Sequence, residues 1–312
     1  METHPSRSAR REARREPSGG ASSSSGGASP AAEGASSSTP TRTSRAGRNL
    51  PAAIGVGVGL GILIIGSLVL RKELMLVIIV AAIGVGVWEL RRGLAQVGIN
   101  VPLVPSLVGS VSMILSAYRG GGQALSVTLG LTCVGILLWR IADGVGDAVR
   151  DVAGGFFVAV YPSFLAGFAA LMLAPQDGAR RTVTFILVTV LSDVGGYAFG
   201  VVFGKHPMAP SVSPKKSWEG FAGSVLTCVV GGAIAVPLLV HGPWWGGAVL
   251  GACAAVAATV GDLTESTIKR DLGIKDMSTI LPGHGGAMDR LDSLLLVAPI
   301  AWALLQVLVP PR

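Results

Sequence analysis

The chain has 312 residues, of which 50% are apolar and only 14% are charged, and its mean hydropathy is +0.61. Soluble domains carry about 25% charged residues, so this composition excludes an ordinary soluble protein and predicts an all-α polytopic membrane protein. The formal charge of +7 would favour a nucleic-acid partner, but eight of the 25 Lys and Arg residues lie before Pro51. An excess in the N-terminal segment favours anionic lipid headgroups instead, and we expect no nucleic acid.

Residues 1–48 differ in composition from the rest of the chain. They are rich in Ser, Gly, Ala, Pro and Arg and have almost no large apolar side chains. Such a segment cannot bury enough surface to offset the entropy lost on ordering. We therefore predict a disordered cytoplasmic tail over residues 1–48 and a transmembrane domain over residues 49–312. We expect no cleavable signal peptide, because the first apolar run follows this long tail and exceeds the usual length.

Apolar stretches of nearly bilayer-spanning length follow one another through the transmembrane domain. The sequence predicts about nine helical spans, at residues 50–70, 74–90, 100–118, 122–139, 152–175, 182–203, 220–240, 244–262 and 293–309. With a cytoplasmic N-terminus, this alternation puts 19 Lys and Arg residues on the cytoplasmic side and 6 on the other. Because basic residues favour cytoplasmic loops, we predict that the N-terminus is cytoplasmic.

The first unusual polar block begins within the sixth predicted span. Asp193 is an ionisable residue in an apolar helix, and Tyr197 follows one turn later. A charge at that depth costs roughly 2.5–3.5 kcal/mol and is usually functional or paired. Asp193 is therefore either a functional residue or the structural partner of a cation on a neighbouring helix. The loop after this span clusters hydroxyl and amino groups suited to polyphosphate binding, although an ordinary juxtamembrane basic patch would look similar. Its candidate substrate-binding residues are Ser213, Lys215, Lys216 and Ser217.

The second block, residues 261–293, carries the strongest signal. On a helix that extends beyond the eighth span, Asp262, Glu265, Ser266 and Lys269 are spaced to share one face. Asp289 and Asp292 share a face at the start of the last span. Carboxylates without soft ligands suit a hard cation such as Mg²⁺, which in many enzymes bridges phosphate oxygens. Both blocks lie on the cytoplasmic side of the predicted topology, as the site of an enzyme that uses a cytoplasmic nucleotide must.

The motif residues between Ser266 and Asp292 resemble the signature of the bacterial phosphatidate cytidylyltransferases, the CDP-diacylglycerol synthases. They are Ser266, Lys269-Arg270, Lys275-Asp276, His284-Gly285-Gly286, Asp289-Arg290 and Asp292. The Ser213–Gly220 block and the segment from Asp193 to Lys205 are similar to the family's other shared segments. Strong resemblance covers residues 191–293. Ser217 replaces the usual Thr, Gly196 the usual Ala and Ala287 a larger aliphatic residue, so no charged or hydroxyl group is lost.

The resemblance implies a Mg²⁺-dependent enzyme of the cell membrane, multi-pass and with its active site facing the cytoplasm. The implied reaction converts CTP and phosphatidic acid into CDP-diacylglycerol and pyrophosphate. We expect the lipid phosphate to attack the α-phosphorus of CTP directly, because no Ser or Cys has an obvious adjacent base. The partners expected are CTP, phosphatidic acid, the bilayer and a second copy in a homodimer.

Roles can be predicted for the polar residues of both blocks. The catalytic candidates are Asp262, Asp289, Lys269 and Arg270; Asp262 and Asp289 would also hold metal, with Asp292 and Asp193 as candidates for a second ion. Lys215, Lys216, Lys269 and Arg270 would bind the triphosphate and the lipid phosphate. The further substrate-binding candidates are Ser213, Ser217, Ser266, Lys275, His284, Gly285, Gly286 and Arg290.

Two other functions and one other feature remain open at this point. A CTP-dependent transferase acting on another membrane lipid would carry the same polar blocks. An ion-coupled transporter is the alternative from a different class, although we find no internal repeat of the kind that transporters often show. Asp143, Asp147 and Asp151 recur every four residues, and this stripe is either a metal-binding face or one paired with arginines.

Overall fold

The structure is a computed structural model, and it describes residues 50–144, 146–278, 280 and 285–309. The predicted tail and His284 lie outside these residues. The described part is helical apart from one short hairpin, which agrees with the predicted all-α class. The helices are α1 (Leu50–Leu70), α2 (Lys72–Gln96), α3 (Leu103–Asp143), α4 (Ala148–Val158), α5 (Leu165–Leu173), α6 (Gly178–Phe203), α7 (Trp218–Ala235), α8 (Trp244–Asp271) and α9 (Met288–Leu308).

Two helices are extended by π-helical segments, and one connection contains strands. The π segment η1 (Ala159–Phe164) joins α4 to α5, and η2 (Val236–Val240) follows α7. Pro162 lies inside η1, where its missing N–H fits the wider turn. The strands β1 (Pro207–Ala209) and β2 (Ser213–Ser217) pair antiparallel.

Seven described helices are long and apolar enough to cross a membrane, against nine predicted spans. They are α2, α3, the α4–α5 unit, α6, α7 with η2, α8 and α9. The difference lies in the first four predicted spans. In α1 the apolar helix Gly57–Leu70 is shorter than a full span. Helix α3 covers two predicted spans at once.

The long element α3 is a hairpin of two helical arms. Gly121 interrupts it with non-helical backbone at φ 72° and ψ −165°, a conformation that favours glycine. Ser116 and Thr128 form a hydrogen bond of 2.9 Å between their hydroxyl groups, and Gly109 lies against Thr132 farther from the turn. Residues on either side of Gly121 therefore face each other with opposite chain directions, as two separate spans would.

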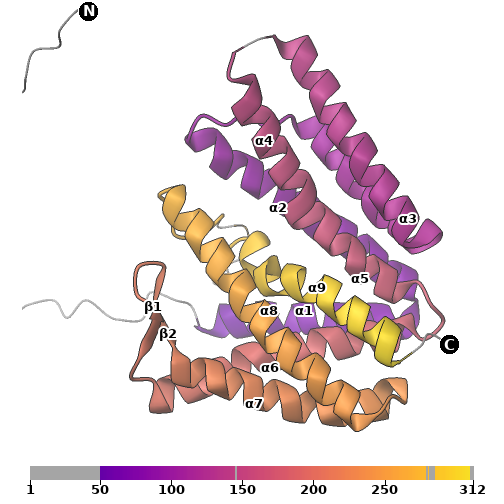
Figure 1. Ribbon diagram of the computed structural model, residues 1–312, viewed down its shortest axis with the longest axis vertical. Coiled ribbons are helices and arrows are strands. Elements are labelled where there is room, and N and C mark those ends of the chain that lie inside the picture. The colour runs from indigo at the N-terminus through magenta and orange to yellow at the C-terminus, as the bar shows by residue number, and fades with distance from the viewer. Residues whose placement is uncertain (1–49, 145, 279, 281–284, 310–312) are drawn as a thin grey trace, which may run out of the picture. The chain divides into compact units, whose positions relative to one another are not determined.

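Helices α6, α7 and α8 lie side by side in the lower part of Figure 1 and approach each other closely. A Cβ on Gly195 of α6 would overlap Thr227 of α7, and one on Gly251 of α8 would overlap the backbone at Cys228. Ser192 and Ser224 share a buried hydrogen bond of 2.6 Å between α6 and α7. Small residues permit this approach where lipid surrounds the helices.

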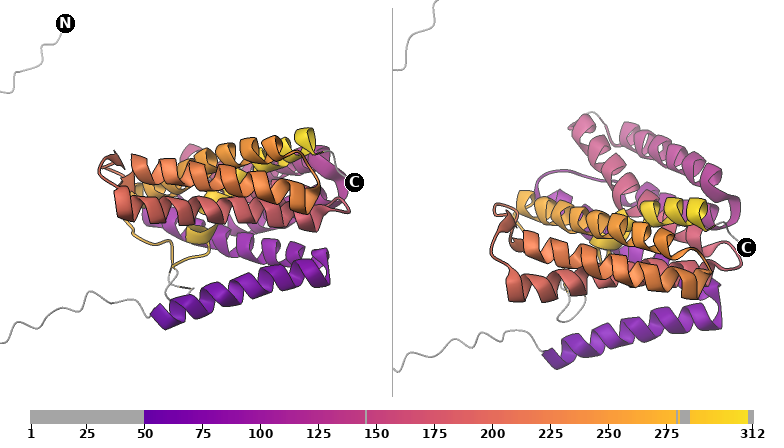
Figure 2. Two further views of the ribbon diagram at one scale, coloured as in Figure 1. Left: turned by 90° about the horizontal axis from the view of Figure 1, so that it is seen from below. Right: turned by 60° about the horizontal axis from the view of Figure 1, so that its bottom comes forward.

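Helices α2 to α5 pack through larger side chains. Ile83 and Leu90 of α2 and Ile114 and Ile136 of α3 are fully buried. Helix α9 lies between α8 and α5, so it joins the two groups (Figure 1). Helix α1 runs along the outside and packs mainly on α2 (Figure 2), with apolar side chains such as Ile62 and Val69 exposed.

One end of the helical bundle is closed by two basic side chains. Lys72 donates hydrogen bonds of 2.7 and 2.8 Å to the carbonyl oxygens of Ala174 and Pro175. The buried Arg181 donates to the carbonyl oxygens of Leu305 and Val309, at 3.2 and 2.6 Å. These bonds satisfy carbonyl groups at helix C-termini. The unusual polar residues lie at the opposite ends of α6 and α9.

Candidate active site

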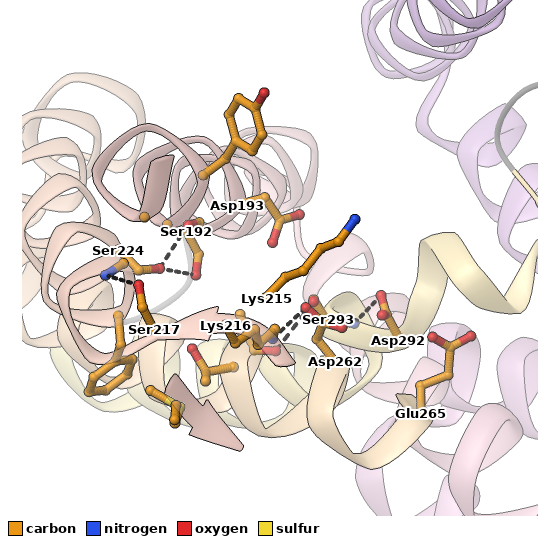
Figure 3. Close-up of a pocket in the computed structure, with 18 of the residues that line it drawn as sticks. Ser192, Asp193, Lys215, Lys216, Ser217, Ser224, Asp262, Glu265, Asp292 and Ser293 are labelled. Carbon is orange, nitrogen blue, oxygen red and sulfur yellow. Dashed lines mark hydrogen bonds and ion pairs between the residues drawn. The ribbon is translucent and has the colours of Figure 1, made fainter. Parts of the chain in front are cut away.

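A polar pocket of about 500 Å³ opens where α6 and α8 end and where α7 and α9 begin. Strand β2 forms a further wall, and Figure 3 shows Asp193 and Lys215 extending into the same space. Nine of the predicted site residues line this pocket: Asp193, Lys215, Lys216, Ser217, Asp262, Lys269, Asp289, Arg290 and Asp292. Two polar blocks separated in the chain by α7, η2 and most of α8 thus meet in space, as the sequence predicts.

The β-hairpin carries Lys215 and Lys216 to the pocket, and its base is fixed to the start of α7. The Glu219 carboxylate accepts hydrogen bonds from the backbone N–H groups of Lys205 and His206 at 3.1 and 3.2 Å, and lies 2.5 Å from His206 Nδ1. Ser217 is the N-cap of α7, since its Oγ accepts from the Gly220 N–H at 3.1 Å. These contacts set the position from which the two lysines extend.

The two lysines have different surroundings. Lys216 forms an ion pair with Asp262 of α8. Lys215 makes no ion pair with any described residue, and it is exposed. Its charge is therefore available to a phosphate group in the pocket.

Lys269 links α8 to α9. Its Nζ lies 2.7 Å from Glu265 Oε2 and 2.8 Å from Asp289 Oδ1. The second oxygen of Asp289 accepts hydrogen bonds from the backbone N–H groups of Met277 and Gly286, at 3.1 and 2.7 Å. Asp262, Glu265 and Lys269 all line the pocket, in agreement with their predicted common helix face.

Several carboxylates converge in the pocket, and they outnumber the basic side chains that line it. Asp193, Asp262 and Asp292 are close enough to interact electrostatically. Glu265 is buried, and its Oε1 has no hydrogen-bond partner among the described residues. Within the described residues, no three Asp, Glu, His or Cys side chains are already arranged as a metal-binding group. The pocket thus has the oxygen donors that a hard cation needs, held apart in this arrangement.

Other predicted site residues lie outside the pocket, and their roles stay predictions. Arg270 follows Lys269 on α8 and so points to another side of the helix, where its Nε donates to the Val212 carbonyl oxygen at 3.4 Å. Lys275 is exposed in the turn after α8. Ser213, Ser266, Gly285 and Gly286 also do not line the pocket, and His284 lies outside the described residues.

Asp143 and Asp151 of the carboxylate stripe do not line the pocket. Asp151 is buried, lies 3.4 Å from Arg140 Nε and accepts a hydrogen bond of 2.7 Å from the Asn100 N–H. The structure therefore favours the arginine-paired interpretation for Asp151.

Three polar residues at or near the site were not predicted from the sequence: Glu89, Ser192 and Ser224. The two serines join α6 to α7 at the pocket wall, and hydroxyl groups in an apolar span give little signal. Glu89 lies outside the pocket lining but binds the segment before α9. A signal for Glu89 did exist, because it is an ionisable residue within the predicted span 74–90.

These features define a multi-pass helical membrane protein whose pocket pairs lysines with carboxylates, as sites for phosphate-bearing substrates do. The model of the cytidylyltransferase family matches residues 51–308. The chain belongs to this family.

Its relatives include a phosphatidate cytidylyltransferase of Mycobacterium bovis, 39% identical over 88% of this chain and 94% of the relative. One of Mycobacterium leprae is 39% identical over 85% of this chain and 90% of the relative. One of Brucella suis is 37% identical over 45% of this chain and 53% of the relative.

Proposed function

We propose that this chain is a phosphatidate cytidylyltransferase, which makes CDP-diacylglycerol and pyrophosphate from CTP and phosphatidic acid. The observation that carries the proposal is the pocket itself, in which Lys215, Lys216, Lys269 and Arg290 surround a group of carboxylates. Relatives of that name, similar over most of the chain, support the choice of substrates. Membership of this family also argues against the ion-coupled transporter.

The reaction requires one bond to form and one to break at the α-phosphorus of CTP. An oxygen of the lipid phosphate attacks this atom, and the bond to the oxygen that bridges to the β-phosphorus breaks, so that pyrophosphate leaves. The protein's task is to hold two anions together and to stabilise charge as it moves to the leaving group. Lys215 is the residue best suited to bind a phosphate, because it has no carboxylate partner among the described residues.

We propose Mg²⁺ as the cofactor. The donor set fits a hard cation, since Asp193, Asp262 and Asp292 supply carboxylate oxygens and repel one another without it. When bound, the ion would neutralise charge on the triphosphate. Asp289, also predicted to hold metal, has both oxygens engaged by Lys269 and two backbone N–H groups. It would have to exchange one of these donors to bind an ion.

We propose nine spans, a cytoplasmic N-terminus and a pocket that opens to the cytoplasm of the cell. Counting α1 and the two arms of α3 separately supports the alternation. The test uses cells that express the chain with its native cysteines replaced. In this background, Gly121→Cys should react with an impermeant maleimide added outside. A cysteine at Lys275 should react only after permeabilisation. The opposite labelling pattern would refute the orientation.

Tyr197 lines the pocket and Trp218 follows the pocket residue Ser217, and both aromatic side chains are exposed. Tyr197 is 76% exposed and Trp218 is 56% exposed, on α6 and at the start of α7. Tyr and Trp are enriched where membrane and water meet. We place the mouth of the pocket at that boundary, where a lipid phosphate and a soluble nucleotide can both reach it.

The reaction is tested by giving purified protein labelled CTP, Mg²⁺ and phosphatidic acid and identifying the lipid product. We expect CDP-diacylglycerol and pyrophosphate in equal amounts. Product with a polyprenol phosphate or an ether lipid, and none with phosphatidic acid, would favour the alternative transferase. A trapped cytidylyl-enzyme would contradict direct attack. Light scattering of the solubilised protein tests the predicted homodimer.

A further inference from the structure

Glu89 is a buried carboxylate near the end of α2, in the part of the chain that contributes nothing to the pocket lining. Its exposure is 0%, and it forms no ion pair with the described residues. Taking a charged group out of water without a counter-ion is costly. A residue that stays in such a place must be stabilised by other polar groups.

Those groups come from the segment before α9, about 190 residues later in the chain. Glu89 Oε1 accepts hydrogen bonds from the Ser278 hydroxyl group at 2.5 Å and from the Ala287 N–H at 3.0 Å. Oε2 accepts from the Met288 N–H at 2.8 Å. Since Met288 begins α9, Glu89 caps that helix from outside, and the positive end of the helix dipole compensates its charge.

The same segment is bound from the other side by a pocket residue. Asp289 accepts hydrogen bonds from the N–H groups of Met277 and Gly286, each next to a residue that Glu89 binds. Gly286 fits between the two carboxylates only because it has no side chain; a Cβ there would overlap Glu89. Asp289 also holds Lys269, so a continuous set of contacts runs from α2 to the pocket.

We propose that Glu89 is a positioning residue for the cytidylyl transfer, holding Ser278 and the start of α9 so that Asp289 and Lys269 keep their places in the pocket. This inference rests on the proposed function. Helix α2 would thus take part in the reaction through a single side chain, that of Glu89. Gln would fill the same volume, but its amide nitrogen cannot accept a hydrogen bond, so one of the converging donors would lose its partner.

The test compares Glu89→Gln with Glu73→Gln, the same chemical change on the same helix. Glu73 is exposed near the other end of α2 and lies 3.2 Å from the Tyr118 hydroxyl group. We expect Glu89→Gln to lower kcat per folded protein about 10- to 100-fold, with KM for CTP changed less than about 3-fold. Glu89→Asp, which keeps the charge, should recover part of the loss, and Glu73→Gln should match the wild type.

A second readout is independent of the substrates. Lys275 is exposed and lies close to the segment that Glu89 holds, so release of the segment should make trypsin cleave after Lys275 several times faster. If the wild type makes no CDP-diacylglycerol, the proposed function fails, and faster cleavage of Glu89→Gln would still support the anchoring contact. Unchanged cleavage would refute that contact.

Two outcomes would overturn the proposal. One is a kcat per folded Glu89→Gln within 2-fold of the wild type. The other is a loss of kcat that a lower melting temperature explains, without faster trypsin cleavage after Lys275. If Glu89→Gln does not fold, Ser278→Ala removes the partner of the shortest contact and should lower kcat about 2- to 5-fold. Where both variants fold, their effects should not multiply in the double variant, because the two side chains touch.

Discussion

Glycines pack closely in both halves of the described chain, but in α3 to α5 they meet side chains, such as Ile136 on Gly155, and in α7 and α8 several of them meet backbone. Helices α2 to α5 bury large aliphatic side chains, such as Ile83 and Ile136. Helices α6 to α8 approach through glycines, such as Gly195 and Gly251, so that backbones almost touch. The side chains that line the polar pocket come from α6 to α9, the hairpin and, with Asp276, the turn after α8. The half that carries the candidate site is thus the half in which helix backbones approach most closely, which suits a site that must position charged groups.

The comparison also shows what the other half supplies. Much of its outer surface is apolar, as expected for contact with lipid, and its Glu89 side chain binds the segment before α9. Substitutions in α6 to α9 should therefore affect the reaction, and those in α1 to α5, apart from Glu89, mainly stability.

The largest effect is expected for Asp262→Asn. The change removes a pocket carboxylate and leaves Lys216 without its ion-pair partner, so kcat/KM should fall about 10³-fold. The control is Asp271→Asn, at the exposed end of the same helix and outside the pocket. Formation of CDP-diacylglycerol from labelled CTP is the measurement. Turnover of Asp262→Asn within 10-fold of the wild type would mean that the pocket is not the reaction site.

A smaller effect is expected for Lys269→Met, about 10²-fold in kcat/KM. It leaves the buried Glu265 and Asp289 without their shared cation. Lys275→Met should cost at most about 3-fold, because Lys275 is exposed outside the pocket. The same assay checks both. Equal losses would show that the turn after α8 closes over the substrates.

Glycine packing can be tested by stability. Gly195→Leu should lower the free energy of unfolding by about 3 kcal/mol, since its Cβ would overlap Thr227 and the backbone at Gly223. Gly66→Ala on α1, where an added Cβ would meet no described residue of another element within 4 Å, should change stability by less than about 1 kcal/mol. Thermal melting in detergent measures both. Similar melting temperatures for the two variants would contradict the proposed difference between the halves.

The smallest effect is expected at the turn of α3. Gly121→Ala should cost about 1 kcal/mol of stability, because φ of 72° strains any residue with a Cβ. Since the turn is remote from the pocket, kcat per folded protein should not change. A loss of turnover at full folding would show that α3 is coupled to the site.

Much of the site could be predicted from the sequence, because charged residues in an apolar chain stand out. Asp262 and Lys269 were found from helical spacing, and the family signature named the segment around Asp289. Arg270 and Lys275 carry the same charges nearby in sequence, and only the direction of each side chain separates them from the pocket residues. Glu89 could be noticed but not assigned, since no spacing rule links α2 to a segment about 190 residues away.

The β-hairpin was also beyond sequence reasoning. Pro214 disfavours a helical conformation at Ser213, but nothing in the sequence links Glu219 to the backbone of Lys205 and His206 at the base of the antiparallel pair. The turn at Gly121, by contrast, agrees with two separately predicted spans.

The proposed position of the pocket, based on the exposed Tyr197 and Trp218, has a kinetic consequence. A pocket at the boundary between membrane and water would receive its two substrates from phases of different dimension. The relevant concentration of CTP is its amount per volume of water, whereas that of phosphatidic acid is its amount per area of membrane. Diluting phosphatidic acid with another lipid should lower the rate even when its total amount is constant, and adding more vesicles of unchanged composition should not restore it.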